Sequence, residues 1–191
     1  MNQTPVYTPI SQDRIAELTT MATEVDAVIH VIRRVCVRQD RDWNHAIGEA
    51  VTCCTKGHDN CTGPEVYEKF RPVSYMKEEI DIVLICYHTK IQELYRSALL
   101  DWEEKTGLQA TVPREIFAIG EGHKDLRVQM RCFPGSMYLV APIEGLIEDC
   151  LKFLFLEWTD SDRYVGVDLV DHLLTSGSWF AFREPSPEPV Q

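Results

Sequence analysis

Hydrophobic residues in the first forty positions recur at three- and four-residue steps. From Ile15 to Val35 the apolar side chains return to one face of a helix. Ser11 precedes this run, and serine is a residue type that caps helix N-termini. The spacing predicts one long helix over residues 12–38.

A second, shorter apolar stripe follows Asp42, another residue type that caps helices. It runs from Trp43 to Cys54, at positions i, i+3, i+4, i+7, i+8 and i+11. Gly57 stands where a helix would end, because glycine adopts the left-handed backbone of a helix C-terminus without strain. We expect a second helix here, followed by a polar loop.

A third stripe extends from Met76 to Trp102, after a potential cap at Ser74. Two interpretations compete for it. Residues 80–87 are dense in β-branched side chains, which favours a strand. The helical period continues unbroken to Trp102, which favours a helix ending at Gly107. We expect the helix.

The pattern changes in the second half of the chain. Short apolar segments at 115–119, 126–133 and 137–141 are separated by glycine-containing turns. In the middle segment apolar and polar residues alternate, as in a strand with one buried face. These segments predict a three-stranded antiparallel meander.

The final third is expected to return to helix and then to end in a strand. Residues 143–158 keep the helical period, residues 164–174 form another such stretch, and residues 178–182 are typical of a strand. Together the elements predict an α+β fold, with N-terminal helices packed with a small C-terminal antiparallel β-sheet and additional helices. We expect a flexible N-terminus at 1–10, a single α+β domain at 11–183 and a flexible Pro-rich tail at 184–191.

The charge of the chain disfavours one class of partner. There are 30 acidic and 19 basic residues, for a formal net charge of −11. Non-specific binding of nucleic acid depends on Lys and Arg neutralising phosphates, so we do not expect a nucleic-acid partner. Four arginines, at positions 33, 34, 38 and 41, gather near the end of the first predicted helix. Positive charge is favourable at a helix C-terminus, and an anion site is the alternative interpretation.

Neither a secretory signal nor a membrane-spanning segment is evident. The first residues lack a basic stretch followed by an apolar one, and no apolar run approaches the ~20 residues needed to cross a bilayer. We therefore expect a cytoplasmic or nuclear protein, not membrane-bound, whose seven cysteines are kept reduced.

The most chemically specific segment runs from Cys53 to Cys61. Thiolates and imidazoles are the ligands that zinc prefers, and the expected helix end and its loop would supply three of them, Cys54, His58 and Cys61. His45, one helical stretch earlier, is the expected fourth ligand. Four protein ligands would make the zinc structural. Ordinary packing of buried cysteines is the alternative, because the spacing matches no established zinc motif.

Two large apolar residues lie outside the stripe of the helix expected at 143–158. Phe153 and Leu156 would sit on its opposite side, where they indicate either burial all round or contact with a protein partner or a second copy of the chain. No catalytic signature accompanies them. The sequence thus favours a non-enzymatic interaction or regulatory protein, which a structural zinc would stabilise if these ligands bind one. A cysteine- or metal-dependent enzyme centred on the Cys54–Cys61 segment is the alternative.

Overall fold

The computed structural model describes residues 7–38, 41–51, 77–88, 95–131, 136–141, 152–160, 162–169 and 178–185, and all structural statements below concern these residues. Its helices are α1 (Gln12–Glu24), α2 (Trp43–Ala50), α4 (Tyr95–Thr106), α5 (Pro113–Gly122) and α6 (Leu126–Gln129). Its strands are β1 (Ala27–Arg38), β2 (Lys77–Tyr87), β3 (Gln109–Ala110), β4 (Met137–Ala141), β5 (Lys152–Trp158), β6 (Arg163–Leu169) and β7 (Ser178–Arg183).

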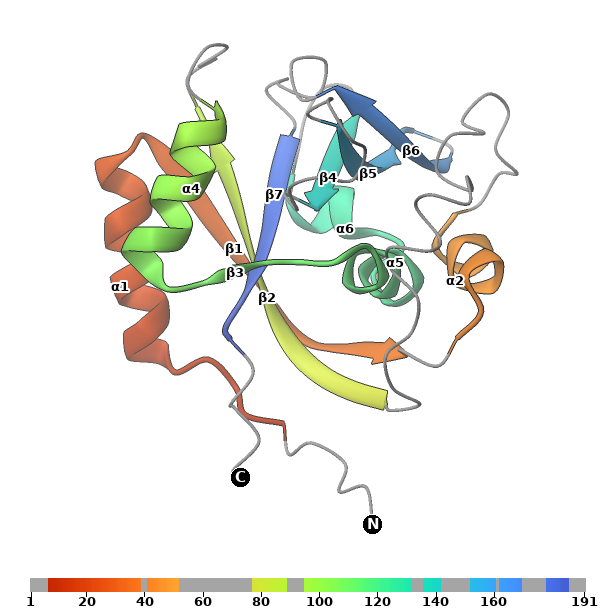
Figure 1. The fold of residues 1–191 in the computed structure, drawn as a ribbon, viewed down its shortest axis with the longest axis horizontal. Helices are drawn as coiled ribbons and strands as arrows, with labels where there is room; N and C mark the ends of the chain where they lie inside the picture. Colours follow the sequence, from red (N-terminus) through yellow and green to blue (C-terminus); the bar gives the residue numbers. More distant parts are fainter. Residues whose placement is uncertain are drawn as a thin grey trace.

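The seven strands form one sheet in the order β1-β2-β7-β4-β5-β6, with the short β3 paired to β7 on the edge away from β2. Neighbouring strands are antiparallel, except that β4 and β7 run parallel. The long hairpin-like pair β1 and β2 dominates one half of the sheet, and the shorter strands make up the other half (Figure 1).

Helices cover both faces of the sheet. In Figure 1, α1 and α4 lie on one side of the strands, and α2, α5 and α6 lie on the other. The central strand β2 divides its side chains between the two layers. Ile82 and Leu84 pack in the cluster with α2 and α5, whereas Val83 and Ile85 pack in the cluster with α1 and α4. The molecule therefore has two cores, one on each side of a shared sheet.

The expected architecture, helices packed with a small C-terminal sheet, is wrong. The sheet is large and begins in the first half of the chain with β1 and β2. The physical reason lies in burial: every residue of β2 from Asp81 to Tyr87 is buried. A strand covered on both faces carries a continuous apolar run instead of a two-residue alternation, and such a run is easily mistaken for part of a helix.

The long helix predicted over residues 12–38 is a helix followed by a strand. Ser11 caps α1 as expected, accepting a hydrogen bond from the Arg14 amide at 3.1 Å. The helix ends at Glu24, and Asp26, with a φ of 52°, turns the chain into β1. β-branched residues fill β1, and pairing with β2 selects the extended form.

The helix expected through Trp102 divides in the same way. Its first part is β2, so the strand interpretation of residues 80–87 was the correct one, and its last part is α4. The predicted start of the second helix is confirmed, but α2 ends at Ala50, with Val51 already extended, although the stripe predicted helix as far as Cys54. α2 starts after Asp42, whose side chain accepts from the His45 amide at 3.2 Å.

The predicted meander is wrong in two of its three segments. Residues 115–119 lie in α5, residues 126–129 form α6, and only residues 137–141 form a strand, β4. Pro113 occupies the first position of α5, and Glu115 accepts from the Val112 amide at 2.8 Å. Both features favour a helix start at this point.

The helices expected over 143–158 and 164–174 are contradicted where the structure describes them, because residues 152–158 form β5 and residues 163–169 form β6. The last predicted strand is confirmed as β7. β7 lies in the middle of the sheet and is buried from Ser178 to Phe182. The chain therefore completes its sheet with its last described strand.

Candidate functional site

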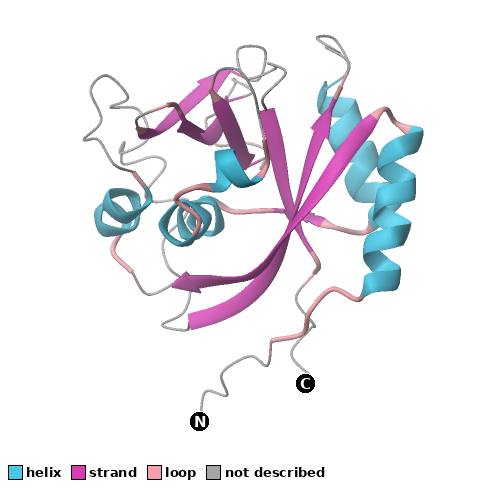
Figure 2. Ribbon diagram, turned by 180° about the vertical axis from the view of Figure 1, so that it is seen from behind, coloured by secondary structure: helices cyan, strands magenta, loops and turns pink. Residues whose placement is uncertain are grey.

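The outer edge of β1 is the first feature with a capacity for binding. Within the described residues, β1 pairs only with β2 and lies at one end of the sheet. The His88 amide donates a hydrogen bond to the Asp26 carbonyl at 2.9 Å, so these two opposed residues form a hydrogen-bonded pair. Along the register that follows, hydrogen-bonded pairs alternate with pairs that are not hydrogen-bonded. In an antiparallel ladder this alternation turns the N–H and C=O groups of Ala27, Ile29 and Val31 away from β2. Figure 2 shows β1 crossing the molecule from the end of α1.

A β-bulge interrupts β1 after this regular stretch. Ile32 pairs with Ile82, but Val35 pairs with Ile80, so Arg33 and Arg34 together oppose Asp81. Arg34 has a φ of 53°, a left-handed backbone uncommon for a side chain other than glycine. The bulge bends the edge and limits regular pairing to the two stretches on either side of it.

The carboxylate of Asp81 holds this bulge in place. It accepts hydrogen bonds from the Arg34 amide at 2.9 Å, the Ile10 amide at 2.9 Å and the Tyr7 hydroxyl at 2.7 Å, and it pairs with the Arg33 guanidinium. Burial disfavours the charged carboxylate, but these donors outweigh burial and lower the pKa of Asp81. Residues 7–10, at the end of the stretch expected to be flexible, are thereby held against the sheet.

The second feature is a small arginine-lined hollow where β1 ends, here called the arginine hollow. Its lining residues come from β1, the loop before α2, α2 itself and α5: Arg38, Arg41, Ala46, Arg114, Phe117, Ala118 and Glu121. Arg41 pairs with Glu121 at 2.6 Å and keeps only 12% of its side chain exposed. Arg114, which is buried, donates to the Arg41 carbonyl. The side chains of Arg41 and Arg114 are thus each held by a partner within the lining of the hollow.

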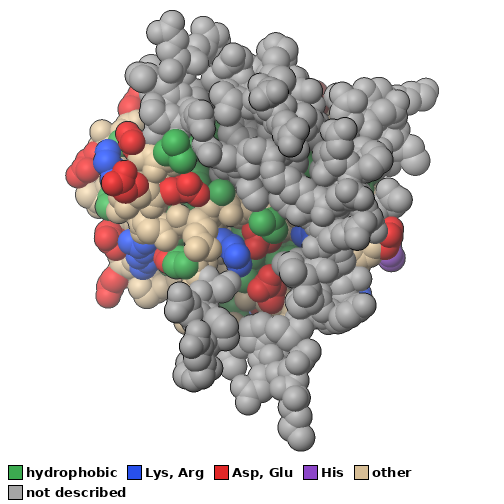
Figure 3. Space-filling model, in the orientation of Figure 1, with side chains coloured by type: hydrophobic (Ala, Val, Ile, Leu, Met, Phe, Trp, Pro, Cys, Tyr) green, Lys and Arg blue, Asp and Glu red, His purple; other side chains and the backbone are tan. Residues whose placement is uncertain are grey.

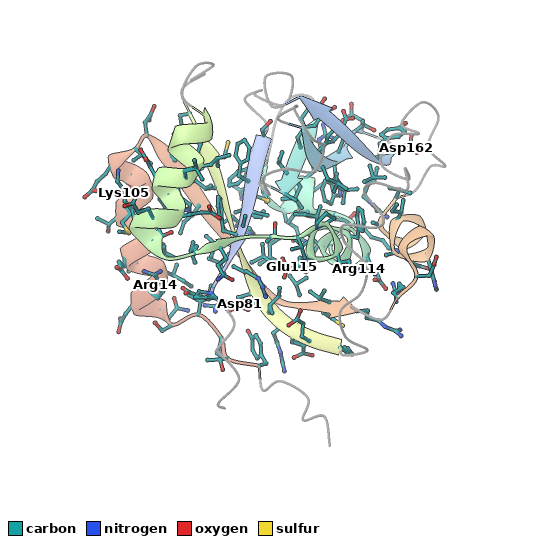
Figure 4. The ribbon with its side chains drawn as sticks, viewed as in Figure 1. Arg14, Asp81, Lys105, Arg114, Glu115 and Asp162 are labelled. Carbon is teal, nitrogen blue, oxygen red and sulfur yellow. The ribbon has the colours of Figure 1, made fainter. Side chains whose placement is uncertain are left out.

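A third feature is an ion pair that joins α5 to the sheet. The Glu115 carboxylate is 3.2 Å from the Arg183 guanidinium of β7 and is 1% exposed. Burial raises the pKa of Glu115 to about 7, although Arg183 and the Val112 amide oppose the shift. Glu115 follows Arg114 at the start of α5, and both are labelled in Figure 4.

Of the predicted zinc ligands, only His45 lies in the described part of the chain. It is exposed near the start of α2, with Nε2 3.4 Å from Glu49 Oε1. Cys54, His58 and Cys61 lie outside the described residues, as does the segment of the alternative cysteine enzyme. Among the residues that are described, no group of three or more His, Cys, Asp or Glu side chains is placed to hold a metal ion.

The two residues predicted to meet a partner lie on β5. Leu156 is fully buried in the core between the sheet and α5, and its strand neighbours are Leu139 and Val165. Phe153 lies near the start of β5 in register with Asp168. Residues three positions apart share a helix face but not a strand face, so the reason for grouping this pair no longer holds.

Sequence reasoning missed the edge of β1 and the arginine hollow for one reason. Both depend on residues 27–38 being a strand, and a helix was expected there. One signal was present: residues 28–37 contain six β-branched residues and no strong helix-stabilising residue apart from the arginines. The hollow itself joins Arg38 and Arg41 to Arg114, more than seventy positions later, a proximity that no local pattern contains.

None of the helices in the described ranges is long and apolar enough to cross a membrane.

Comparison with known proteins identified no relative of this chain. No protein-family model, no curated protein and no solved structure matches this chain.

Proposed function

We propose that the chain is a non-enzymatic, intracellular interaction protein that binds an extended segment of a protein partner along the outer edge of β1. The observation that carries this proposal is the outward direction of the backbone groups of Ile29 and Val31 at the end of the sheet. An extended peptide that adds a strand to such an edge gains main-chain hydrogen bonds irrespective of its side chains.

The neighbouring residues support binding at the same place. Val28 is 38% exposed, which is unusual for a large apolar residue in this structure, and it lies between the outward-facing positions. An added strand would cover part of that apolar surface. The Asp81 cluster fixes the backbone just beyond Ile32, so the edge is held in one conformation before a partner arrives. A preformed edge lowers the entropic cost of binding.

The outward N–H of Ile29 gives a sharp test. Proline at this position removes that donor but leaves the ladder with β2 intact, because the N–H does not face β2. Ile29→Ala is the matched control, since it removes the same side chain and keeps the N–H. Random twelve-residue peptides displayed on phage would be selected on the wild-type protein. The best peptides would then be measured on both variants by fluorescence anisotropy.

The proposal expects peptides that bind wild type and Ile29→Ala within about threefold of each other and bind Ile29→Pro at least about tenfold more weakly. Circular dichroism and thermal melts would establish that Ile29→Pro is folded. Failure to select any peptide, or equal binding to the proline variant, would overturn it. Concentration-dependent dimerisation that Ile29→Pro abolishes would also overturn it, because the edge would then be covered by a second copy of the chain.

A structural zinc bound by Cys54, His58, Cys61 and His45 remains part of the proposal for the segment after α2. Its support is the donor set in the sequence, since thiolate and imidazole ligands suit zinc. Elemental analysis of protein purified without a histidine tag should find about one zinc per chain, reduced in Cys54→Ser and in Cys61→Ser. Metal content that neither substitution changes would contradict the site. His45→Ala tests the fourth ligand separately.

A further inference from the structure

We infer that the segment bound along β1 carries an acidic side chain, which the arginine hollow receives beyond the last residue of the strand. This inference rests on the proposed function. The arginine hollow adjoins the proposed binding edge, because Arg38 is the last residue of β1 and also lines the hollow. A segment that pairs beside Ile29 and Val31 and continues in the same direction past the bulge would therefore reach the arginines.

The chemistry of the hollow selects an anion. Among the described residues that line it are three arginines, Arg38, Arg41 and Arg114, and one carboxylate, that of Glu121. A guanidinium carries five N–H donors in a planar fork, so the one carboxylate that pairs with Arg41 leaves donors for a second acceptor. Carboxylates and phosphates match this fork in bidentate geometry.

The positions of the arginines are fixed before any ligand arrives. Glu121 orients the Arg41 side chain at 2.6 Å, and Arg114 of α5 is held by the Arg41 carbonyl. Ala46 and Phe117 supply apolar walls, which lower the local dielectric and strengthen a charged hydrogen bond. The hollow is small, with a cavity volume of about 10 Å³, roughly that of one water molecule, so it would admit only the outermost atoms of a side chain and not a free metabolite.

The structure also rules out the helix-dipole explanation for the clustering of Arg38 and Arg41. At the end of a helix, Arg38 and Arg41 would interact favourably with the helix dipole. Residues 27–38 are a strand, and strands have only small net dipoles. The site also contrasts with the rest of the molecule. The chain has a net charge of −11, and Figure 3 shows acidic side chains spread over the face formed by α1 and α4. An acidic segment would be repelled there and attracted to the hollow.

The experiment uses the peptides selected for β1. The tightest peptide that contains Asp or Glu would be compared with a version in which that residue is Gln or Asn, on wild type and on two charge-reversed variants. Arg38→Glu changes the hollow. Lys105→Glu makes the same change of charge on α4, on the opposite side of the sheet, as Figure 4 shows for Lys105 and Arg114. A phosphoserine version distinguishes a phosphate from a carboxylate source.

We expect Arg38→Glu to weaken binding of the acidic peptide at least about tenfold and binding of the neutral peptide less than about threefold. Lys105→Glu should change neither affinity by more than about twofold, and the preference for the acidic peptide should shrink with added salt. Selected peptides without an acidic preference, or equal losses in Arg38→Glu and Lys105→Glu, would overturn the inference while leaving binding at the edge intact. Failure of the edge itself would instead appear as binding that Ile29→Pro does not affect.

Discussion

The backbone amide of Arg34 donates a hydrogen bond to the Asp81 carboxylate at 2.9 Å, across the bulge between β1 and β2. A side chain thus supplies the acceptor that the regular ladder lacks where the two strands fall out of register. The same carboxylate accepts from the Ile10 amide and from the Tyr7 hydroxyl. One residue consequently fixes the bulge, the outer edge of β1 beside it and the segment that precedes α1.

Asp81→Ala should lower the free energy of unfolding by about 3 kcal/mol, because buried donors lose a charged acceptor and Arg33 loses its ion-pair partner. Chemical denaturation measures this loss. Thr8→Ala serves as the control, since Thr8 is exposed and close to the same segment. An effect no larger than that of the control would contradict the central role of the carboxylate.

Acid should act through the same residue. The pKa of Asp81 is lower in the folded state than in the unfolded state, so its stabilisation is complete above the unfolded pKa of about 3.8 and is lost as the pH falls through the folded-state pKa. Asp81→Asn should therefore have a smaller loss of stability than wild type below about pH 4. If the free energy of unfolding falls equally steeply with decreasing pH in the two proteins, this linkage is wrong.

Glu115 should have the opposite dependence on pH. Its pKa is raised from 4.5 to about 7, so the folded state binds its proton more tightly than the unfolded state does. Wild-type stability should accordingly fall by about 3 kcal/mol between pH 4.5 and 7 on account of this group. Glu115→Gln keeps a similar shape and should flatten that decline. Thermal melts across this pH range, with Glu104→Gln on the exposed surface as the control, provide the measurement.

Gly120 lies where α5 comes closest to its neighbours. A Cβ at this position would lie 2.5 Å from Leu156 Cδ2 and 3.0 Å from the Ala50 carbonyl oxygen. Gly120→Ala should destabilise the fold by about 2 kcal/mol through overpacking. Gly122→Ala, in the last turn of the same helix and with no atom within 4 Å of its Cβ, should be neutral or slightly stabilising. Equal melting temperatures for the two variants would show that α5 can move away.

Leu156 should behave as a core residue. It is fully buried, so Leu156→Ala should cost about 3 kcal/mol of unfolding free energy. Val128→Ala, at a position 67% exposed on α6, should cost less than about 0.5 kcal/mol. A folded, stable Leu156→Ala protein with an altered association state would restore the partner-binding interpretation of this position.

Local sequence features predicted the starts of elements better than their type. Ser11 and Asp42 cap helices as expected, because a capping bond involves only residues three positions apart. The extents were wrong where periodicity had to choose between helix and strand. Val28 to Val37 and Ile80 to Tyr87 fit both patterns, and the pairing between them, which selects the strand, joins residues about fifty positions apart.

The sequence by itself determined the starts of α1 and α2, the strand at 178–182 and the net negative charge, since each depends on neighbouring residues or on composition alone. Only the tertiary structure decided that β1 and β2 are strands, that β1 lies at an edge and that Arg38, Arg41 and Arg114 meet. Backbone hydrogen bonds inside a helix are local, whereas those of a sheet need a partner strand. An apolar segment whose partner strand lies far along the chain therefore acquires its structure, and its place at the edge of the sheet, only when the two strands come together.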